Sequence, residues 1–362
     1  MRSCLLLLSS CVLLIGCGKS ASPDKATGAK PKAAKPDAAN AIEAVANAKS
    51  KKNSAGNIAE VDFRGTAVTP EQLQALSGLP KLRSVLLNGL ELNDAHLEAI
   101  AKSKTIANLD LRGCAVTNDW LKAISRMSQV KALRLSDASG KAQFDDDGLK
   151  YLSGLKNLKV IVLDEAWLSE EGLAHLPKDN LSELYLKNSG AGCDDAVPIL
   201  LQMPKLKKLR LAMTQFSDAG LHGLRKIKTL EELDISECGL ISDAGMNSVG
   251  TMKSLKKLNL WRVQITDDGV AKLSGLTGLK WLNLDNTQLA DSGTAHLSGM
   301  KQLEFLHLGS TLITDEGLPS LAGLTSLKDL KITRTGVTAD GAAKLKESLK
   351  DTDIQLSYVD GQ

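Results

Sequence analysis

The chain has 362 residues, of which 43% are hydrophobic, only 3% are aromatic and 24% are charged. This composition supplies a large folded body whose core is built from aliphatic side chains. Residues 1–57 hold nine basic residues against three acidic ones, so the rest of the chain, with 36 basic and 39 acidic residues, is close to neutral. No basic concentration is visible along it, and we therefore expect no nucleic-acid partner.

The first residues read as an export signal. Arg2 precedes an apolar run from Cys4 to Ile15, which is too short to cross a bilayer but suits the apolar region of a signal peptide. Residues 1–16 are therefore predicted to be a signal peptide that is removed.

The run ends in Leu14-Ile15-Gly16-Cys17, which resembles the lipobox of bacterial lipoproteins. The resemblance implies cleavage before Cys17, lipidation of its sulfur and anchoring by several acyl chains, palmitate-like in kind, as the membrane contact. Residue 18 is Gly and not Asp, which by the same resemblance indicates the outer membrane of the cell envelope. The alternative is an ordinary signal peptide with an incidental cysteine.

Residues 17–37 are predicted to be the lipidated cysteine and a disordered tether, because Lys, Ala, Pro and Ser dominate and no large apolar side chain is present. Its lysines either touch anionic headgroups or are simply solvated. Residues 38–57 are expected to form an N-terminal capping helix and a connection, since Ile42 and Val45 share a helical face and lysines follow.

From residue 58 onward the leucines repeat. Seven of the eleven intervals between unit starts are 24 residues. The twelve units start at Ile58, Leu82, Ile106, Val130, Leu158, Leu181, Leu206, Leu230, Leu255, Leu279, Leu303 and Leu327.

One unit reads Leu255-Lys-Lys-Leu258-Asn-Leu260-Trp-Arg-Val263-Gln-Ile265, and the following unit repeats the pattern. It resembles the leucine-rich-repeat family, and the T/S-D-x-G-L segment after it looks like the cysteine-containing and ribonuclease-inhibitor-like subtypes. The resemblance covers residues 58–353, with residues 354–362 expected as a C-terminal cap strand and tail.

Two periodicities within each unit predict its local structure. Apolar residues at positions four and six alternate with outward residues, which is typical of a strand, and leucines every three residues, as at Leu318, Leu321 and Leu324, predict a helix. A strand, a helix and a parallel strand cross right-handed. The prediction is an α/β, right-handed leucine-rich-repeat solenoid, a horseshoe of about twelve units with parallel strands on the concave face and helices on the convex face.

Two positions should shape the turns. Position nine of most units carries Thr or Cys. In the family that these units resemble, the side chain at this position bonds to the turn backbone. Position twelve is expected to supply the helix N-caps Thr69, Thr117, Ser169, Ser217, Ser242, Thr266, Thr314 and Thr338. Unit four has an insertion around Ser139–Phe144 that should form a bulging loop.

A column of aspartates follows these caps: Asp94, Asp146, Asp218, Asp243, Asp267, Asp291 and Asp315. Calcium sites are one interpretation, but a carboxylate beside the exposed N–H groups at a helix start is favoured, since calcium loops are denser in ligands. No metal and no cofactor are predicted.

Candidate catalytic patterns follow from the repeat itself. Ser-x-x-Lys occurs at Ser153 and Ser254, yet Ser-Gly-Leu recurs at helix ends in several units. The histidines of the body are scattered without a metal spacing. We therefore expect no enzyme. Cys114 and Cys238 lie five units apart, too far to bridge, and Cys193 lies two units from Cys238 at a different position, so three unpaired thiols are predicted.

Positions three, five and seven of each strand should face the concave side, free for recognition. Trp281 and Phe305 occupy one position on neighbouring strands and should lie about 5 Å apart. The candidate partner-binding residues are Arg210, Asn259, Trp261, Trp281, Asn283, Phe305 and His307. The rings either form an interaction hot spot or merely cover one another.

The sequence thus predicts a non-catalytic, lipid-anchored protein of the cell envelope that binds a protein partner of unknown identity on its concave face. The alternatives are a module that recognises envelope glycan or peptidoglycan fragments and a structural spacer. The membrane contact is expected to be the lipid anchor only.

Overall fold

The computed structural model describes residues 42, 45 and 47–357, which all fall within one compact unit, Pro36–Gln362. The predicted signal peptide, the lipidation site Cys17 and the tether lie outside the described residues. None of the described helices is long and apolar enough to span a bilayer.

Short strands recur once in every unit, as the leucine pattern predicts. They are β1 Lys49–Lys52, β2 Ile58–Asp62, β3 Ser84–Leu86, β4 Asn108–Asp110, β5 Ala132–Ser136, β6 Val160–Asp164, β7 Glu183–Tyr185, β8 Lys208–Arg210, β9 Glu232–Asp234, β10 Lys257–Asn259, β11 Trp281–Asn283, β12 Phe305–His307, β13 Asp329–Lys331 and β14 Asp353–Gln355.

Helical segments alternate with these strands. The α-helices are α2 Pro70–Ala75, α3 Asp94–Ala101, α4 Asn118–Ile124, α5 Asp146–Leu149, α6 Glu170–Ala174, α7 Val197–Leu200, α8 Asp218–Leu224, α9 Asp243–Val249, α10 Asp267–Leu273, α11 Asp291–Thr294 and α12 Ala339–Ser348. The 3₁₀ helices are η1 Leu76–Gly78, η2 Lys150–Gly154, η3 Lys178–Asn180, η4 Asp194–Ala196, η5 Ala295–Leu297 and η6 Leu318–Leu321.

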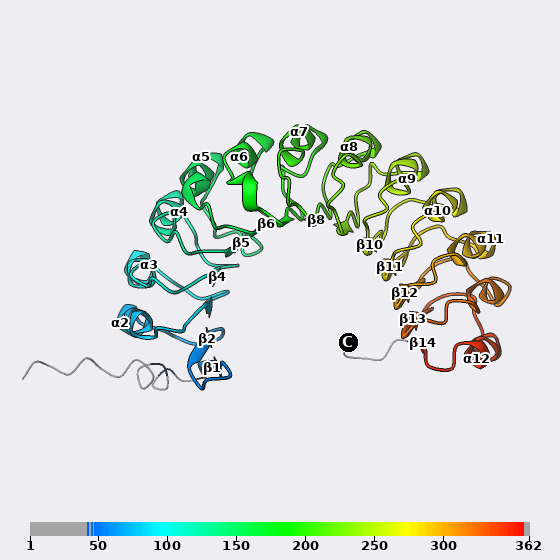
Figure 1. The fold of residues 1–362 in the computed structure, drawn as a ribbon, viewed down its shortest axis with the longest axis horizontal. Helices are drawn as coiled ribbons and strands as arrows, with labels where there is room; N and C mark the ends of the chain where they lie inside the picture. Colours follow the sequence, from blue (N-terminus) through cyan, green and yellow to red (C-terminus); the bar gives the residue numbers. More distant parts are fainter. Residues whose placement is uncertain (1–41, 43–44, 46, 358–362) are drawn as a thin grey trace, which may run out of the picture. The chain divides into compact units, whose positions relative to one another are not determined.

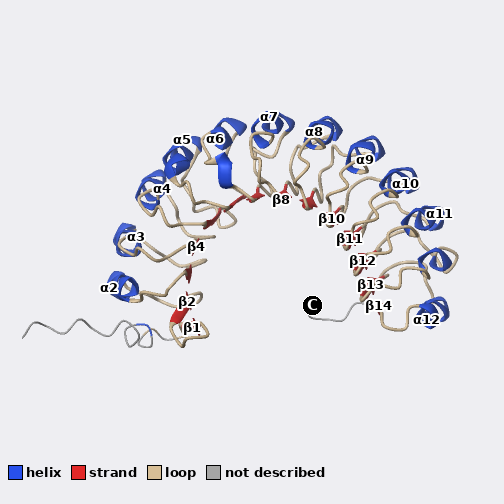
Figure 2. Cartoon of the chain, in the orientation of Figure 1, coloured by secondary structure: helices blue, strands red, loops and turns tan. Residues whose placement is uncertain are grey.

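All fourteen described strands form one sheet in which each strand pairs with its neighbours in chain order. From β2 to β14 the pairing is parallel, and β1 pairs with β2 antiparallel within the region expected as a connection. The strands line the inner side of an open arc and the helices its outer side (Figures 1 and 2). The predicted solenoid is therefore confirmed.

The core runs through the arc without a break because equivalent leucines stack from unit to unit. Leu258 pairs in register with Leu282, and Leu306 pairs with Leu330. All four side chains are fully buried. Each unit thus covers the apolar face of the next, which an isolated unit could not bury. Ile42 and Val45 join the same core, although the helix predicted around them lies mostly outside the described residues.

Most of the predicted caps are present. The side chains of six residues accept a hydrogen bond from the first helical turn: Thr69, Thr117, Ser217, Ser242, Thr266 and Thr338. Ser169 begins α6 without such a bond. Thr314 accepts from Glu316, but its unit forms only η6, because leucines spaced every three residues with Pro319 among them match the period of a 3₁₀ helix.

The insertion in unit four is closed by a hydrogen bond across its own base and is joined to the preceding unit at its end. Asp137 accepts a hydrogen bond from the Ala142 amide at 2.8 Å, the Gln143 amide donates to Val116 at 2.7 Å, and Phe144 is buried. The loop is therefore anchored at its base instead of hanging free.

The column of aspartates links consecutive units. We expected these carboxylates only to lie beside the exposed N–H groups at the helix starts. Asp291 accepts from the Thr314 amide and hydroxyl, both at 2.7 Å, and Asp146 accepts from Ser169 at 3.0 and 2.6 Å. Asp194, Asp218, Asp243 and Asp315 make the equivalent contacts one unit onward, whereas Asp267 accepts from the Ala290 amide and the Ser292 hydroxyl. We call this set the aspartate ladder.

The glycine of the T/S-D-x-G motif makes room for the aspartate ladder. A Cβ added at Gly293 would lie 2.3 Å from Oδ1 of Asp267, one unit earlier. The motif therefore encodes a contact between units, with the aspartate supplied by one unit and the glycine by the next.

Candidate functional site

Two aromatic rings stand stacked on the concave surface of the last third of the arc. Trp281 and Phe305 pair in register on β11 and β12, and their ring centroids are 4.8 Å apart at an interplanar angle of 5°. The separation agrees with the prediction of about 5 Å. Both rings are only partly buried, so part of each remains open to a partner.

Lysines lie over this ring pair from neighbouring strands. Nζ of Lys257 lies 4.5 Å from the Trp281 ring centroid, and Nζ of Lys331 lies 5.9 Å from that of Phe305. We call Lys257, Trp281, Phe305 and Lys331 the concave row. The ring quadrupole attracts a cation to the face of an aromatic ring. The faces of Trp281 and Phe305 are therefore largely occupied by the other ring and by the two lysines.

His307 adjoins the concave row on β12. Its ring meets Phe305 edge-on at 6.3 Å. Burial lowers the pKa of His307 below its ordinary value, with Asp285 and Asp329 opposing this shift and Lys331 adding to it. The imidazole is therefore neutral at pH 7 and offers one donor and one acceptor nitrogen.

The two asparagines of the predicted site have structural hydrogen bonds as well. Oδ1 of Asn259 accepts from the Trp261 amide at 3.2 Å, and Oδ1 of Asn283 accepts from the Asp285 amide at 2.9 Å. The expectation that position five is wholly free for recognition is therefore wrong, because its side chain satisfies the backbone where the strand ends.

Two candidates lie outside the three strands that hold the others. Arg210 lies on β8 and is engaged by Asp164 at 3.4 Å and Asp234 at 3.3 Å. Its Nε is buried and lacks hydrogen-bond geometry, although it lies within ion-pair distance of Asp234. Trp261 follows β10, where Arg262 lies 5.4 Å from its ring centroid. The structure thus gathers Asn259, Trp281, Asn283, Phe305 and His307 on three adjacent strands.

A polar notch beside the concave row was not predicted. Gly309 has no side chain, and a Cβ placed on it would lie 2.8 Å from Nε2 of His307, 2.9 Å from Oγ1 of Thr333 and 3.0 Å from Oδ1 of Asp285. Three polar atoms therefore crowd the place that a side chain at residue 309 would take, and we call this group the polar notch. The sequence does contain a signal, since Gly309 occupies position seven of its unit, where other units carry a side chain.

The most exposed aromatic side chain among the described residues was also missed. Trp167 is 87% exposed in the turn after β6. It lies at position ten of its unit, outside the concave positions on which the sequence argument concentrated.

Three cysteines lie among the described residues. Cys114, Cys193 and Cys238 are unpaired, as predicted. Burial raises the pKa of the Cys114 and Cys238 thiols, which disfavours the nucleophilic thiolate. Over residues 42, 45 and 47–357, no group of three or more His, Cys, Asp or Glu is placed to hold a metal ion.

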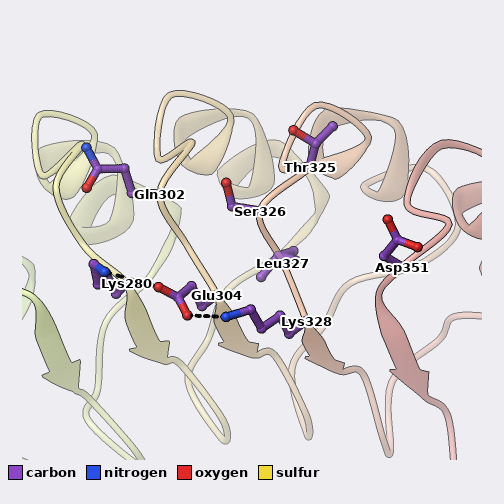
Figure 3. A pocket seen from close by; sticks show the side chains of 8 residues that line it. All are labelled: Lys280, Gln302, Glu304, Thr325, Ser326, Leu327, Lys328 and Asp351. Carbon is purple, nitrogen blue, oxygen red and sulfur yellow. Dashed lines mark hydrogen bonds and ion pairs between the residues drawn. The ribbon is translucent and has the colours of Figure 1, made fainter.

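A shallow hollow lies where the strands of the last units begin (Figure 3). Lys280, Glu304 and Lys328 cross it, with Glu304 at 3.2 Å from Lys280 and 2.7 Å from Lys328. The two ammonium groups lower the pKa of Glu304. The charges in this hollow largely compensate one another.

Comparisons with known proteins agree with the fold. Residues 253–313 and 226–250 match two family models, both described as leucine-rich repeat. Over 90 residues the chain is 37% identical to the PH domain leucine-rich repeat protein phosphatase 1 of Rattus norvegicus. That match covers 25% of this chain and only 5% of the phosphatase.

Among solved structures, a chain in the crystal structure of the Rad7 and Elc1 complex in yeast is similar, with a TM-score of 0.58 and 17% identity over 80% of this chain and 84% of that one. An internalin from Listeria monocytogenes gives a TM-score of 0.47 at 18% identity over 86% of this chain and 92% of that one. At such identities the likeness concerns the fold. The repeat models, the register of the sheet and the fold agree: this chain is a leucine-rich-repeat solenoid.

Proposed function

We propose that this chain is a lipid-anchored protein of the bacterial cell envelope, held at the outer membrane through Cys17, that binds a protein partner on its concave face without catalysing a reaction. The solenoid is a scaffold suited to protein–protein contact. The observation that carries the proposal is the concave row, a pair of stacked, partly exposed rings in a chain with few aromatics.

The geometry of the row favours a protein over a glycan. Sugar rings bind aromatic residues by lying flat on an open ring face, but here each ring faces the other at 4.8 Å and Lys257 lies over Trp281 at 4.5 Å. Edge-exposed rings between charged and amide groups match the composition of protein interfaces.

The partner site is tested with the double variant Trp281→Ala/Phe305→Ala. Wild type and variant are cross-linked in detergent-solubilised envelope, and each captured protein is then purified and its affinity measured. Loss of two central rings should weaken binding by at least about thirtyfold. The matched control, Tyr151→Ala/Trp167→Ala, removes two exposed rings outside the concave strands and should retain affinity.

The smaller change Gly309→Ala places a methyl group within 3.0 Å of polar atoms of His307, Thr333 and Asp285, whose side-chain ends must shift. It should weaken the same complex and leave the unfolding temperature nearly unchanged. Equal affinity of the wild type, the double variant and the notch variant would overturn the concave site. Binding of purified peptidoglycan fragments that is lost in the double variant, with no protein captured, would favour the glycan alternative.

The anchor is tested separately through Cys17. Mass spectrometry of the membrane-extracted chain should show acyl chains on an N-terminal Cys17, and Cys17→Ser should release the protein from membranes of cells that express it. An unmodified chain that begins before Cys17 would contradict lipidation. The partner site is judged by the affinity measurements alone.

A further inference from the structure

The parallel arrangement sorts the charges of the chain onto two opposite edges of the solenoid. All strands from β2 onward start at the same edge, so the residues that precede each strand gather there. The helices begin at the other edge. Charges that alternate along the sequence are thereby separated in space, and the near-neutral total hides this separation.

The strand-start edge of the first units is strongly basic. Four successive segments that lead into β3, β4, β5 and β6, residues 76–83, 101–107, 125–131 and 150–159, contain no acidic residue. Lys150 pairs with Asp147; we call the other exposed cations of these segments the basic edge: Lys81, Arg83, Lys102, Lys104, Arg126, Lys131, Lys156 and Lys159. The expectation that the body has no basic concentration therefore needs correction.

The cations of the basic edge are largely uncompensated. Among the described residues, its six lysines have neither an ion pair nor a hydrogen bond. Arg126 lies 4.0 Å from Glu98, at the limit of an ion pair, and Arg83 donates to the carbonyls of Leu82 and Thr105. The later units differ, since Lys207 pairs with Glu231 at 2.7 Å and Glu304 bridges two lysines. Other lysines there donate to backbone carbonyls, as Lys253 does to Gly275 at 2.9 Å.

Acidic residues occupy the opposite edge of the same units. Those at or near the helix starts are Asp94, Asp119, Asp145, Asp146, Asp147, Glu170 and Glu171. Helix dipoles account for part of this sorting, because they favour acids at helix starts and bases at helix ends. They do not account for Arg83, Lys131 and Lys159, which lie beyond the helices at the second position of a unit.

We propose that the basic edge of units one to five rests on an anionic lipid surface. Strand starts on neighbouring units are ~4.8 Å apart, which is less than a Debye length of ~8 Å, so their potentials add along the row. Successive units stand side by side along the arc (Figure 1), and its edge therefore presents their cations one after another to a surface. In strand β1 at this end of the body, Lys49 and Lys52 add positive charge, whereas Lys51 pairs with Glu60 at 2.7 Å.

A lipid surface fits better than a nucleic acid. Tyr151 is the one exposed aromatic residue in the four described segments of the basic edge. These segments therefore offer no succession of rings on which bases could stack. A surface contact through the edge also leaves the concave row open to a partner. The inference does not depend on the identity of that partner.

The test uses the full chain carrying Cys17→Ala, so that no acyl chain contributes. Partition onto phosphatidylcholine vesicles is compared with partition onto vesicles in which about a third of the lipid is phosphatidylglycerol. The chain should bind the anionic vesicles, bind neutral ones weakly and dissociate as salt rises. Lys102→Gln, Lys104→Gln, Lys131→Gln and Lys159→Gln together should reduce the partition coefficient at least about a hundredfold.

The matched control carries Lys207→Gln, Lys253→Gln, Lys280→Gln and Lys328→Gln, the same change of net charge on the same edge among compensated lysines. It should reduce partition less than about tenfold. Thermal unfolding checks that both variants are folded. Equal partition onto neutral and anionic vesicles, equal loss in the two variants, or tighter binding to duplex DNA than to anionic vesicles at the same salt would each overturn the proposal.

Discussion

The carboxylate of Asp243 accepts two hydrogen bonds from Thr266 in the next unit, one from the backbone amide at 2.8 Å and one from the hydroxyl at 2.7 Å. Thr266 in turn caps α10. One acidic side chain thus holds the start of the following helix in place, and the same relationship recurs along the aspartate ladder.

Replacing Asp243 by Ala should lower the free energy of unfolding by about 1–3 kcal/mol, because a partly buried amide and hydroxyl lose their acceptor. Chemical denaturation of both proteins measures the difference. Asp268→Ala is the matched control, since Asp268 lies in the first turn of α10 and its carboxylate is outside the ladder. It should cost less than about 1 kcal/mol. Equal losses would show that helix-end charge, not the ladder, matters.

Gly269→Ala should also destabilise the chain, because Gly269 makes room for the Asp243 carboxylate of the preceding unit. The new Cβ would lie 2.2 Å from Oδ1 of Asp243 and 3.1 Å from Cβ of Ile265, so the ladder must open. We expect a loss of about 1–3 kcal/mol in the free energy of unfolding. Gly239→Ala has open space around the added Cβ and should be nearly neutral. In the double variant with Asp243→Ala, the two losses should be less than additive.

The thiols should differ in reactivity. In the folded protein, an alkylating reagent should modify Cys193, which is partly exposed, but not Cys114 or Cys238, which are buried and have raised pKa values. After unfolding without reductant all three should react. Peptide mapping by mass spectrometry assigns each site, and a disulfide between any two of them would contradict the structure.

His307 should make stability depend on pH. Because its pKa is lowered in the folded state, the unfolded chain binds the proton more readily. The stability that neutral His307 contributes is complete above the ordinary histidine pKa of 6.5. It is lost as the pH falls from 6.5 towards the lowered pKa of the folded state. Urea unfolding near pH 7.5 and near pH 5.5 should therefore show a smaller loss of stability on acidification in His307→Gln than in the wild type. Identical losses would exclude this role.

Much of the fold could be predicted because each unit encodes its own strand and helix start. The 24-residue interval alone places Trp281 beside Phe305, and six predicted caps act as caps. Contacts between units were harder to predict. The Asp-x-Gly spacing was visible, but pairing the aspartate with the next unit's Ser or Thr requires the exact register of two turns 23 or 24 residues apart.

The site was predicted less completely for a related reason. The concave positions could be identified, yet the sequence could not show that Asn259 and Asn283 are partly used by their own turns. The notch at Gly309 is defined by residues from three strands around an absent side chain, and a search for chemically active residues passes over a glycine. The basic edge likewise emerges only when the units are stacked.

Strand β1 also has a consequence for how the solenoid ends. A sheet built from like units exposes a terminal strand to which another chain could add, giving fibres. Here β1 runs opposite to β2, which interrupts the parallel series, and its residues Lys49, Ser50, Lys51 and Lys52 are all exposed. A second copy approaching this end would meet a reversed strand and lysine charge, which disfavours end-to-end polymerisation.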